Sequence, residues 1–377
     1  MSLSIAGLGT ALPPFSISQD QIAAFSRPLC CDDANQAELF SLIFQHAGVN
    51  RRHSVLQLGE CEKTFVPQSF YPLRDCGRGP STARRMQEYE TAAPPLAIAA
   101  ARKALDDAQL VPDEVTHLVT VSCTGFMAPG IDMKVLEGLM LKPTVERTHI
   151  GFMGCHGAIN GLKVARGCLT AEPEARVLVC CVELCTLHFF TGWDPEKIVA
   201  NALFADGAAA VVCQTSPAPP PLDEAAGRPP ISIQDGTAWK LAAVGTMRIP
   251  DSSAAMSWRI GDYGFDMGLS RQIPELIGLH LRGWVESWLG RQGLALEDIG
   301  SWAVHPGGPK ILDAAEQALS LPAGALEDSR AVLAECGNMS SPTLLFVLER
   351  LRERNAARPC AVLGFGPGMV VEAALFV

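Results

Sequence analysis

Short apolar runs alternate with longer segments in which apolar residues recur at helical spacing. Apolar runs bounded by turn residues predict buried strands, and they lie at residues 1–9, 117–122, 176–182, 207–212, 301–304, 359–364 and 370–377. Apolar positions three and four residues apart predict helices at residues 94–109, 158–170, 273–290 and 341–351. This alternation favours an α/β fold with buried sheets. We expect the first strand to end in a turn at its glycines.

A proline-rich segment at residues 216–230 divides the chain into a longer and a shorter half. Proline removes a backbone donor and disfavours both helices and strand pairing, so we predict a loop there. In each half, a helix and a strand are followed by a second helix and two further strands. The repeated order predicts two duplicated α/β domains, residues 1–220 and residues 221–377.

The composition narrows the classes of function. The net charge of the 377-residue chain is −10 and no run of Lys or Arg occurs, which argues against a nucleic-acid-binding protein. No apolar run reaches membrane-spanning length, and the first residues lack the charged region of a signal peptide. The 13 cysteines show no spacing typical of a metal site. We therefore expect a cytoplasmic protein with reduced thiols and no metal.

Cys155 lies between a glycine turn and the start of an apolar helix, in the sequence Gly-Phe-Met-Gly-Cys-His-Gly-Ala. A helix N-terminus presents free N–H groups and a partial positive charge. Both stabilise a thiolate, which is the nucleophilic form of cysteine, and the N–H groups can also bind an oxyanion on an attached acyl group. The alternative is a small buried cysteine, which is the more common environment.

Two polar residues occupy corresponding places in the second half. His305 ends an apolar strand and enters a Gly/Pro turn, where α/β sheets place ligand-binding and catalytic groups, although a lone histidine is more often structural. Asn338 follows a glycine and precedes a helix, so it is either an N-cap or an amide donor to a carbonyl oxygen. Together with Cys155, these residues predict covalent acyl transfer with stabilisation of an enolate oxygen.

Five motifs, which occur in this order along the chain, extend this set. The first is Gly154-Cys155 before an Ala/Gly-rich helix, and the second is Ala-Leu-Phe-Ala-Asp-Gly-Ala-Ala-Ala at 202–210. The others are Val-His-Pro-Gly-Gly-Pro at 304–309, Gly-Asn-Met-Ser-Ser at 337–341 and Gly-Phe-Gly-Pro-Gly at 364–368. With them the sequence resembles type III polyketide synthases, the chalcone-synthase-like branch of the thiolase superfamily, over nearly the whole chain. Residues 122–130 are similar to bacterial members. The resemblance implies a thiolase-like fold, in which two duplicated α/β domains form a five-layered αβαβα core.

The resemblance also implies the reaction. Cys155 would take a starter acyl group from coenzyme A, while His305 and Asn338 would activate the cysteine and promote decarboxylation of malonyl-CoA. Repeated extension and cyclisation would give an alkylpyrone, an alkylresorcinol or another aromatic polyketide, with no cofactor beyond the coenzyme A thioesters that serve as substrates.

The same resemblance implies how the cavity is lined. Phe204 and Phe265 match the two gatekeeper aromatics of the family. His188 is unusual, and it either narrows the cavity or hydrogen-bonds a growing polyketide. The full implied lining is Cys123, Thr124, Cys185, Leu187, His188, Met256 and Ser340.

Two departures concern the acyl donor and the assembly. Plant relatives bind the coenzyme A phosphates with cations in an early helix, whereas Leu42 and His46 stand in the corresponding segment here. Arg51 and Arg52 are nearby substitutes, and a carrier protein is the alternative source of the starter. The resemblance implies a homodimer, in which Ala128 stands where plant relatives place a methionine in the partner's cavity.

Two other functions stay open from the sequence. A ketoacyl synthase III-type enzyme shares the Cys–His–Asn set but stops after one extension, and the motifs at 337–341 and 364–368 disfavour it. The second is a different class of protein, a non-catalytic subunit that serves as the partner of a condensing enzyme. Retention of Cys155, His305 and Asn338 disfavours this function. Hydroxymethylglutaryl-CoA synthases use a glutamate near the nucleophile, and the sequence has no comparable motif.

Overall fold

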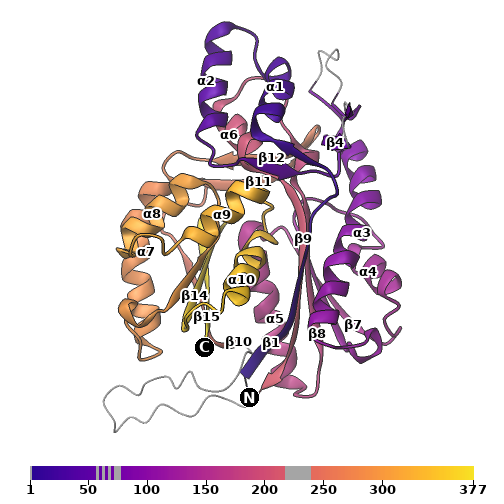
Figure 1. The fold of residues 1–377 in the computed structure, drawn as a ribbon, viewed down its shortest axis with the longest axis vertical. Helices are drawn as coiled ribbons and strands as arrows, with labels where there is room; N and C mark the ends of the chain where they lie inside the picture. Colours follow the sequence, from indigo (N-terminus) through magenta and orange to yellow (C-terminus); the bar gives the residue numbers. More distant parts are fainter. Residues whose placement is uncertain (1, 57–58, 62–63, 67–68, 72–77, 217–238) are drawn as a thin grey trace.

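A nine-stranded sheet runs through the described part of the chain. This computed structural model describes residues 2–56, 59–61, 64–66, 69–71, 78–216 and 239–377. β1 pairs with β10 only between Leu3–Ile5 and Trp239–Leu241, so the sheet consists of two halves that diverge from this seam (Figure 1). The strand order is β13 (Ser301–Val304), β14 (Cys360–Gly366), β15 (Val370–Phe376), β10 (Trp239–Arg248), β1 (Ser2–Ala11), β9 (Asp206–Ser216), β8 (Val177–Leu184), β6 (His117–Ser122) and β7 (Glu146–Gly151).

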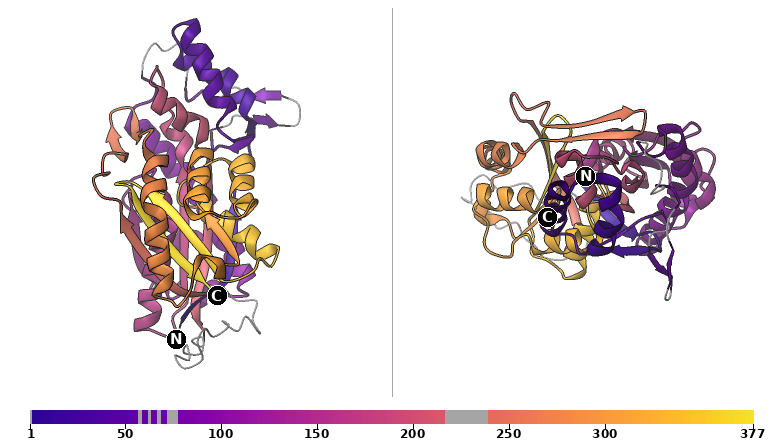
Figure 2. Two further views of the ribbon diagram at one scale, coloured as in Figure 1. Left: turned by 90° about the vertical axis from the view of Figure 1, so that its left-hand side faces the viewer. Right: turned by 90° about the horizontal axis from the view of Figure 1, so that it is seen from above.

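Helices cover both outer faces of the divided sheet and fill the space between its halves (Figures 1 and 2). Outside the half that contains β6 to β9 lie α3 (Thr82–Asp107) and α4 (Ile131–Leu139). Outside the other half lie α7 (Ile273–Gly290) and α8 (Pro309–Leu319). Between the halves lie α5 (Gly157–Ala171) and α10 (Thr343–Glu353), in a third buried apolar cluster. The predicted α/β class and the five layers are confirmed.

Most predicted elements agree with the structure, and α3 is the main exception. The strands predicted at 117–122 and 301–304 are β6 and β13, and the helix predicted at 273–290 is α7. α3 begins at Thr82 rather than at residue 94 and continues through Pro94 and Pro95. An interior proline costs a helix about 3 kcal/mol. The helix offsets that cost by packing a long buried face, which includes Tyr89, against the sheet.

β1 does not end in the predicted glycine turn. It continues to Ala11, and its glycines face α3. A Cβ atom on Gly7 would lie 2.2 Å from the backbone oxygen of Ala104, and one on Gly9 would lie 2.5 Å from the backbone nitrogen of the same residue. These two glycines therefore let the helix approach the strand closely. The proposed domain boundary at residue 220 and the predicted loop, apart from Ser216, lie outside the described residues.

Short elements gather at the upper end of the molecule in Figure 1. β6 and β8 are parallel, as are β13 and β14, and their carboxyl ends point to this region, where open α/β sheets place their sites. The elements are α1 (Gln19–Cys30), α2 (Ala34–Gln45), α6 (Pro195–Leu203), α9 (Glu327–Cys336), β2 (Ser16–Ser18), β3 (Arg51–His53), β4 (Gly59–Cys61), β5 (Thr64–Val66), β11 (Met256–Gly261) and β12 (Gly264–Leu269). Single 3₁₀ turns are η1 (Pro112–Glu114), η2 (Gly154–His156), η3 (Cys185–His188) and η4 (Leu296–Asp298).

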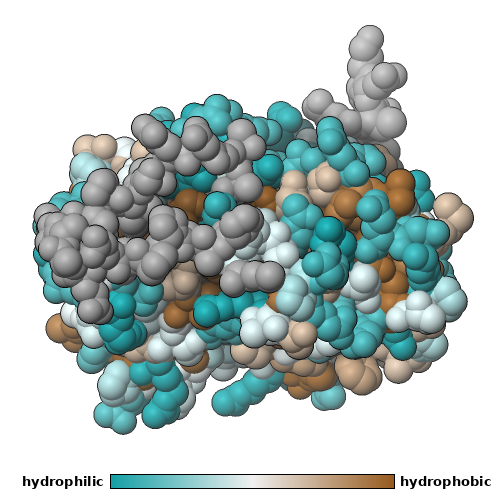
Figure 3. Space-filling model, turned by 90° about the horizontal axis from the view of Figure 1, so that it is seen from below, coloured by the Kyte–Doolittle hydropathy of each residue, from teal (hydrophilic) through white to brown (hydrophobic). Residues whose placement is uncertain are grey.

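The opposite end of the molecule shows polar and apolar side chains intermixed where the surface is described (Figure 3). None of the described helices combines the length and the apolar composition that crossing a membrane requires.

Candidate active site

Cys155 lies in η2, directly before α5. The preceding Gly154 has a φ of +71°, and a Cβ atom there would lie 2.4 Å from Pro367 Cδ. Only glycine fits this position, because both the conformation and the space exclude a side chain. Gly154 thus brings the Cys155 segment against the loop that follows β14 in the other half of the molecule.

The environment of Cys155 opposes ionisation in the free protein. Burial raises the pKa of its thiol to about 11, and the nearby Glu183 carboxylate adds to the increase. Hydrogen bonds from the Ser340 and Asn338 side chains act in the opposite direction. Burial therefore outweighs the hydrogen bonds, and the Cys155 thiol is in its neutral form at neutral pH. A base is needed to remove the proton.

His305 follows β13 and is 1% exposed. Its backbone N–H donates to Leu363 O of β14 at 2.8 Å, whereas neither ring nitrogen has a hydrogen-bond partner among the described residues. Burial, followed by the charge of His156, lowers the pKa of His305 to about 3. The ring is therefore a neutral imidazole with one donor and one acceptor nitrogen, neither of which a described residue engages.

Asn338 connects the second half to the segment around Phe204. Its N–H donates to Leu203 O at 2.9 Å, and its carbonyl oxygen accepts from Ala205 N–H at 2.9 Å. Its side-chain oxygen accepts from Ser340 N–H at 2.8 Å, which leaves the amide NH₂ as the donor toward Cys155. Asn338 does not cap α10, whose N-cap position is Pro342. The N-cap alternative is therefore wrong, and donation by the amide to a carbonyl oxygen stays a prediction.

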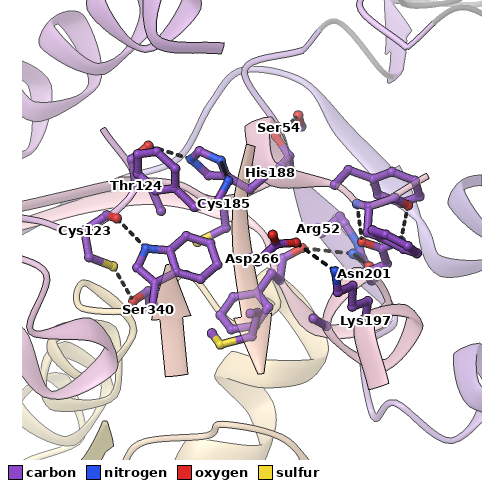
Figure 4. A pocket seen from close by; sticks show the side chains of 18 of the residues that line it. Arg52, Ser54, Cys123, Thr124, Cys185, His188, Lys197, Asn201, Asp266 and Ser340 are labelled. Carbon is purple, nitrogen blue, oxygen red and sulfur yellow. Dashed lines mark hydrogen bonds and ion pairs between the residues drawn. The ribbon is translucent and has the colours of Figure 1, made fainter. Parts of the chain in front are cut away.

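One cavity of about 1140 Å³, including its opening to solvent, contains most of the residues that the sequence singles out (Figure 4). His305 and Asn338 are not among its lining residues, although Asn338 hydrogen-bonds Cys155, which does line it. The predicted residues on its wall are Cys123, Thr124, Cys155, Cys185, His188, Phe204, Met256, Phe265 and Ser340.

Leu187 departs from the predicted lining. Its side chain is fully buried in the apolar cluster around α3, on the other side of the cavity wall. The reason is the 3₁₀ geometry of η3, in which residues three apart lie above one another. Cys185 and His188 therefore face the cavity together, while Leu187 points away.

Glu183 is a buried carboxylate that the sequence analysis missed. It is fully enclosed, and burial raises its pKa while hydrogen bonds lower it. It accepts from Thr124 Oγ1 at 2.7 Å, from Ser341 Oγ at 2.6 Å and from Cys123 N–H at 2.9 Å. A single acidic residue inside the apolar run of β8 was the available signal, because an unpaired carboxylate is rarely placed in a core strand. Glu183 holds in place the loop that supplies Cys123 and Thr124 to the cavity.

Arg52 does not have the phosphate-binding position that the sequence suggests. Its buried guanidinium donates to the carbonyl oxygens of Asn201 at 2.6 Å and Phe204 at 2.9 Å, and it also binds Ala202 O and Gln19. It therefore satisfies the carbonyl groups at the carboxyl end of α6. Leu42 and His46 lie at the exposed surface of the early helix region, as the sequence implies.

A fixed cation does occur at the cavity wall, on α6. Lys197 Nζ lies 2.8 Å from Asp266 Oδ1 of β12 and 4.6 Å from the centre of the Phe190 ring. Figure 4 shows Lys197, Arg52 and Asn201 on one side of the cavity and Cys123, Thr124 and Ser340 on the other. Because Asp266 neutralises Lys197, the wall carries little net charge near Phe265.

Comparison with known proteins identifies the class of enzyme. Residues 2–217 match the N-terminal domain of chalcone and stilbene synthases, and residues 240–377 match their C-terminal domain. A 1,3,6,8-tetrahydroxynaphthalene synthase of Streptomyces peucetius subsp. caesius is 33% identical over 98% of this chain and 91% of its own length. The alpha-pyrone synthesis polyketide synthase-like Pks18 of Mycobacterium tuberculosis is 30% identical over 99% and 90% of the two lengths.

Solved structures agree with this match. PKS-I from the brown alga Ectocarpus siliculosus superposes with a TM-score of 0.88 at 27% identity, covering 100% of this chain and 98% of that one. The C-terminal type III polyketide synthase domain of Steely1 from Dictyostelium gives a TM-score of 0.87 at 26% identity, with 100% and 99% coverage. The fold is thiolase-like, as predicted. The chain belongs to the chalcone and stilbene synthase family and is a type III polyketide synthase.

Proposed function

We propose that this type III polyketide synthase loads an acyl starter on Cys155 and extends it by repeated decarboxylative condensation with malonyl-CoA. The observation that carries the proposal is the position of Cys155. Its buried thiol lines the cavity and hydrogen-bonds the side chains of Asn338 and Ser340.

Loading begins with proton transfer from the Cys155 thiol to the neutral His305 ring. The sulfur then attacks the thioester carbonyl of the acyl donor, and the oxyanion that forms is bound by nearby N–H groups. When the tetrahedral intermediate collapses, the carbon–sulfur bond to coenzyme A breaks. The coenzyme A thiolate takes the proton back from His305, which returns to its neutral form.

Extension needs donors to an enolate. The malonyl thioester oxygen would accept hydrogen bonds from the Asn338 amide and from one ring N–H of His305. The bond to the carboxylate breaks, CO₂ leaves, and the electron pair forms the enolate. The enolate carbon attacks the Cys155 thioester, the carbon–sulfur bond breaks, and the Cys155 thiolate takes a proton from solvent. The extended chain, now a thioester of coenzyme A, is transferred back to Cys155 as in loading. Repetition gives a poly-β-keto chain that cyclises in the same cavity.

Products of the alkylpyrone, alkylresorcinol or other aromatic polyketide class are proposed. The names of the relatives support this range, since one is a tetrahydroxynaphthalene synthase and another is assigned to alpha-pyrone synthesis. The family match supports repeated extension over the single-round ketoacyl synthase and over a non-catalytic subunit. The starter is delivered on coenzyme A or on a carrier protein.

A homodimer is part of the proposal. Ala128 lies in an exposed loop beside Phe126, which is 67% exposed. The support for the homodimer is the resemblance to the family, in which the position of Ala128 contributes to the cavity of the partner. Light scattering during size-exclusion chromatography tests the assembly. A monomer at micromolar concentration contradicts it.

The central experiment is product analysis by mass spectrometry with malonyl-CoA and acyl-CoA starters from acetyl to palmitoyl. Pyrones or resorcinols that carry the alkyl chain of the starter are expected, and Cys155→Ala should form none. Intact mass should show an acyl adduct on the unmodified protein alone. A single-extension product would contradict the proposal. If acyl-CoA starters leave no adduct, starters on an acyl carrier protein are tested next. An adduct from these starters would show that coenzyme A was the unsuitable donor, and no adduct would show that the site is inactive.

A further inference from the structure

We infer that His188 is a positioning residue that fastens the hairpin β11–β12, and with it Phe265, to the cavity wall. The contacts themselves are independent of the reaction. The consequence for product length rests on the function proposed above.

Both nitrogens of the His188 ring are engaged by backbone groups. Phe265 N–H donates to Nδ1 at 3.0 Å, and Nε2 lies 2.7 Å from Thr124 O. A carbonyl oxygen only accepts, so Nε2 carries the proton and Nδ1 is the acceptor. The ring thus bridges the gatekeeper strand to the loop after β6 in one fixed tautomer.

The His188 ring also packs against the side chains of the hairpin. It stacks on Phe265 with ring centres 4.3 Å apart and an angle of 17°, and it meets the edge of Trp258 at 5.4 Å. Trp258 Nε1 donates to Cys123 O at 2.6 Å. Phe265 is therefore held from its backbone and from its ring, and its side chain has little freedom to rotate.

These side-chain contacts matter because the hairpin forms a two-stranded sheet of its own. Among the described strands, β11 and β12 pair only with each other. An isolated hairpin is at most marginally stable in water, so its position depends on contacts with the rest of the molecule. His188 supplies the contact at Phe265 itself, and the ion pair of Lys197 with Asp266 supplies the next one along β12.

The same contacts decide between the two alternatives for His188 in favour of the narrower cavity. A polyketide carbonyl oxygen could accept from Nε2–H only by displacing Thr124 O, and an enol hydroxyl could donate to Nδ1 only by displacing Phe265 N–H. A buried backbone group left without a partner is unfavourable. Burial lowers the pKa of His188 to about 3, with the Arg85 charge adding to the decrease. The ring therefore stays neutral and keeps its Nδ1 acceptor at neutral pH.

Hydrogen exchange at the Phe265 amide in the substrate-free protein provides the direct test. His188→Phe keeps a stacking ring but removes the Nδ1 acceptor, so exchange of this amide should accelerate roughly tenfold. His188→Asn places an oxygen near the Nδ1 position and should retain the protection. His188→Gln keeps only the donor toward Thr124 and should lose it. His280→Phe, on the outer helix α7, is the matched control.

Product analysis then tests the functional consequence. In His188→Phe the Cys155 acyl adduct should still form, and the products should spread over several chain lengths. The melting temperature should fall, because Thr124 O and Phe265 N–H each lose a partner. Unchanged exchange of the Phe265 amide in both His188→Phe and His188→Gln would overturn the proposal that His188 fastens the hairpin. Faster exchange with an unchanged product distribution would overturn its role in specificity. If His188→Phe does not fold, the comparison of His188→Asn with His188→Gln still tests whether Nδ1 protects the Phe265 amide. Absence of any product from the unmodified protein refutes the proposed function and leaves the exchange result valid.

Discussion

At the scale of the residue, the protonation states of Cys155 and His305 follow from their burial. The pKa of the thiol is raised to about 11 and the pKa of the imidazole is lowered to about 3. Both groups are consequently neutral at pH 7, and the thiolate–imidazolium pair is not formed in the free protein. Neutral imidazole is the form that accepts a proton, so in the proposed mechanism His305 takes the proton of Cys155 when the acyl donor binds.

Alkylation of Cys155 by iodoacetamide should therefore depend on pH throughout the neutral range. Only the thiolate reacts, and a pKa of about 11 means that the thiolate fraction rises about tenfold with each pH unit below it. We expect the rate, followed by intact mass, to rise steadily from pH 6 to pH 9. A plateau below pH 7 that disappears in His305→Ala would instead demonstrate a preformed ion pair.

The donors proposed for the enolate can be separated from the nucleophile by mutation. Cys155→Ala should lose the acyl adduct and retain decarboxylation of malonyl-CoA, since loading needs the sulfur and enolate formation does not. Asn338→Ala should slow decarboxylation by about 10²–10³-fold and affect loading much less, whereas His305→Ala should impair both. Release of CO₂ and acylation by intact mass measure the two steps separately. Loss of loading alone in Asn338→Ala would contradict the assignment.

At the scale of the element, buried strands were the easiest features to predict. All six residues of β6 and all four of β13 are buried, so their apolar runs mark the strand bounds directly. The hairpin β11–β12 was not predicted, because its burial is partial and irregular along both strands. Its position depends on His188 and Trp258, which a local pattern does not reveal.

Side-chain direction was harder to predict than the bounds of an element. Cys185, Leu187 and His188 are neighbours in sequence, and only the 3₁₀ turn separates the two that face the cavity from the one that does not. Arg52 was misassigned for a similar reason. The carbonyl groups that it binds at the end of α6 lie about 150 residues away along the chain.

Two glycines provide a test of how closely α3 packs on β1. Gly7→Ala places a methyl group 2.2 Å from Ala104 O, where backbone must move, so the free energy of unfolding should fall by about 1–3 kcal/mol. Gly167 is exposed within α5, and a Cβ atom there would meet none of the described residues within 4 Å. Gly167→Ala should stabilise the protein by up to about 1 kcal/mol. Denaturant unfolding measures the free energy of unfolding of both variants. If Gly7→Ala changed it by the same amount as Gly167→Ala, β1 and α3 could separate at little cost.

At the scale of the whole molecule, the site is assembled from both halves. Cys155 comes from the first half, His305 and Asn338 come from the second, and Gly154 against Pro367 brings the two together. Each half is recognisable alone in the sequence, but their contact depends on the central cluster of α5 and α10 between diverging sheets. For this reason the candidate residues were predictable, whereas the distances and the protonation states were not.

The net charge of the molecule bears on how it binds an anionic acyl donor. The chain carries a charge of −10, α2 has no cation in its first or last turn, Arg52 is bound to carbonyl groups and Lys197 is paired with Asp266. Attraction between these groups and the coenzyme A phosphates therefore contributes little to binding, and the net charge repels the ligand.

The KM for malonyl-CoA should accordingly stay constant or fall, by less than about threefold, between about 0.05 and 0.3 M salt, because salt screens a repulsion rather than an attraction. A starter thioester of pantetheine, which lacks the nucleotide phosphates, should have a KM within about tenfold of that of the acyl-CoA. A steep increase of KM with salt, together with poor use of the pantetheine thioester, would instead reveal a basic phosphate site. Arg51→Ala and Lys197→Ala would then locate it, since Lys197 lines the cavity and Arg51 is exposed directly beside Arg52, which also lines it.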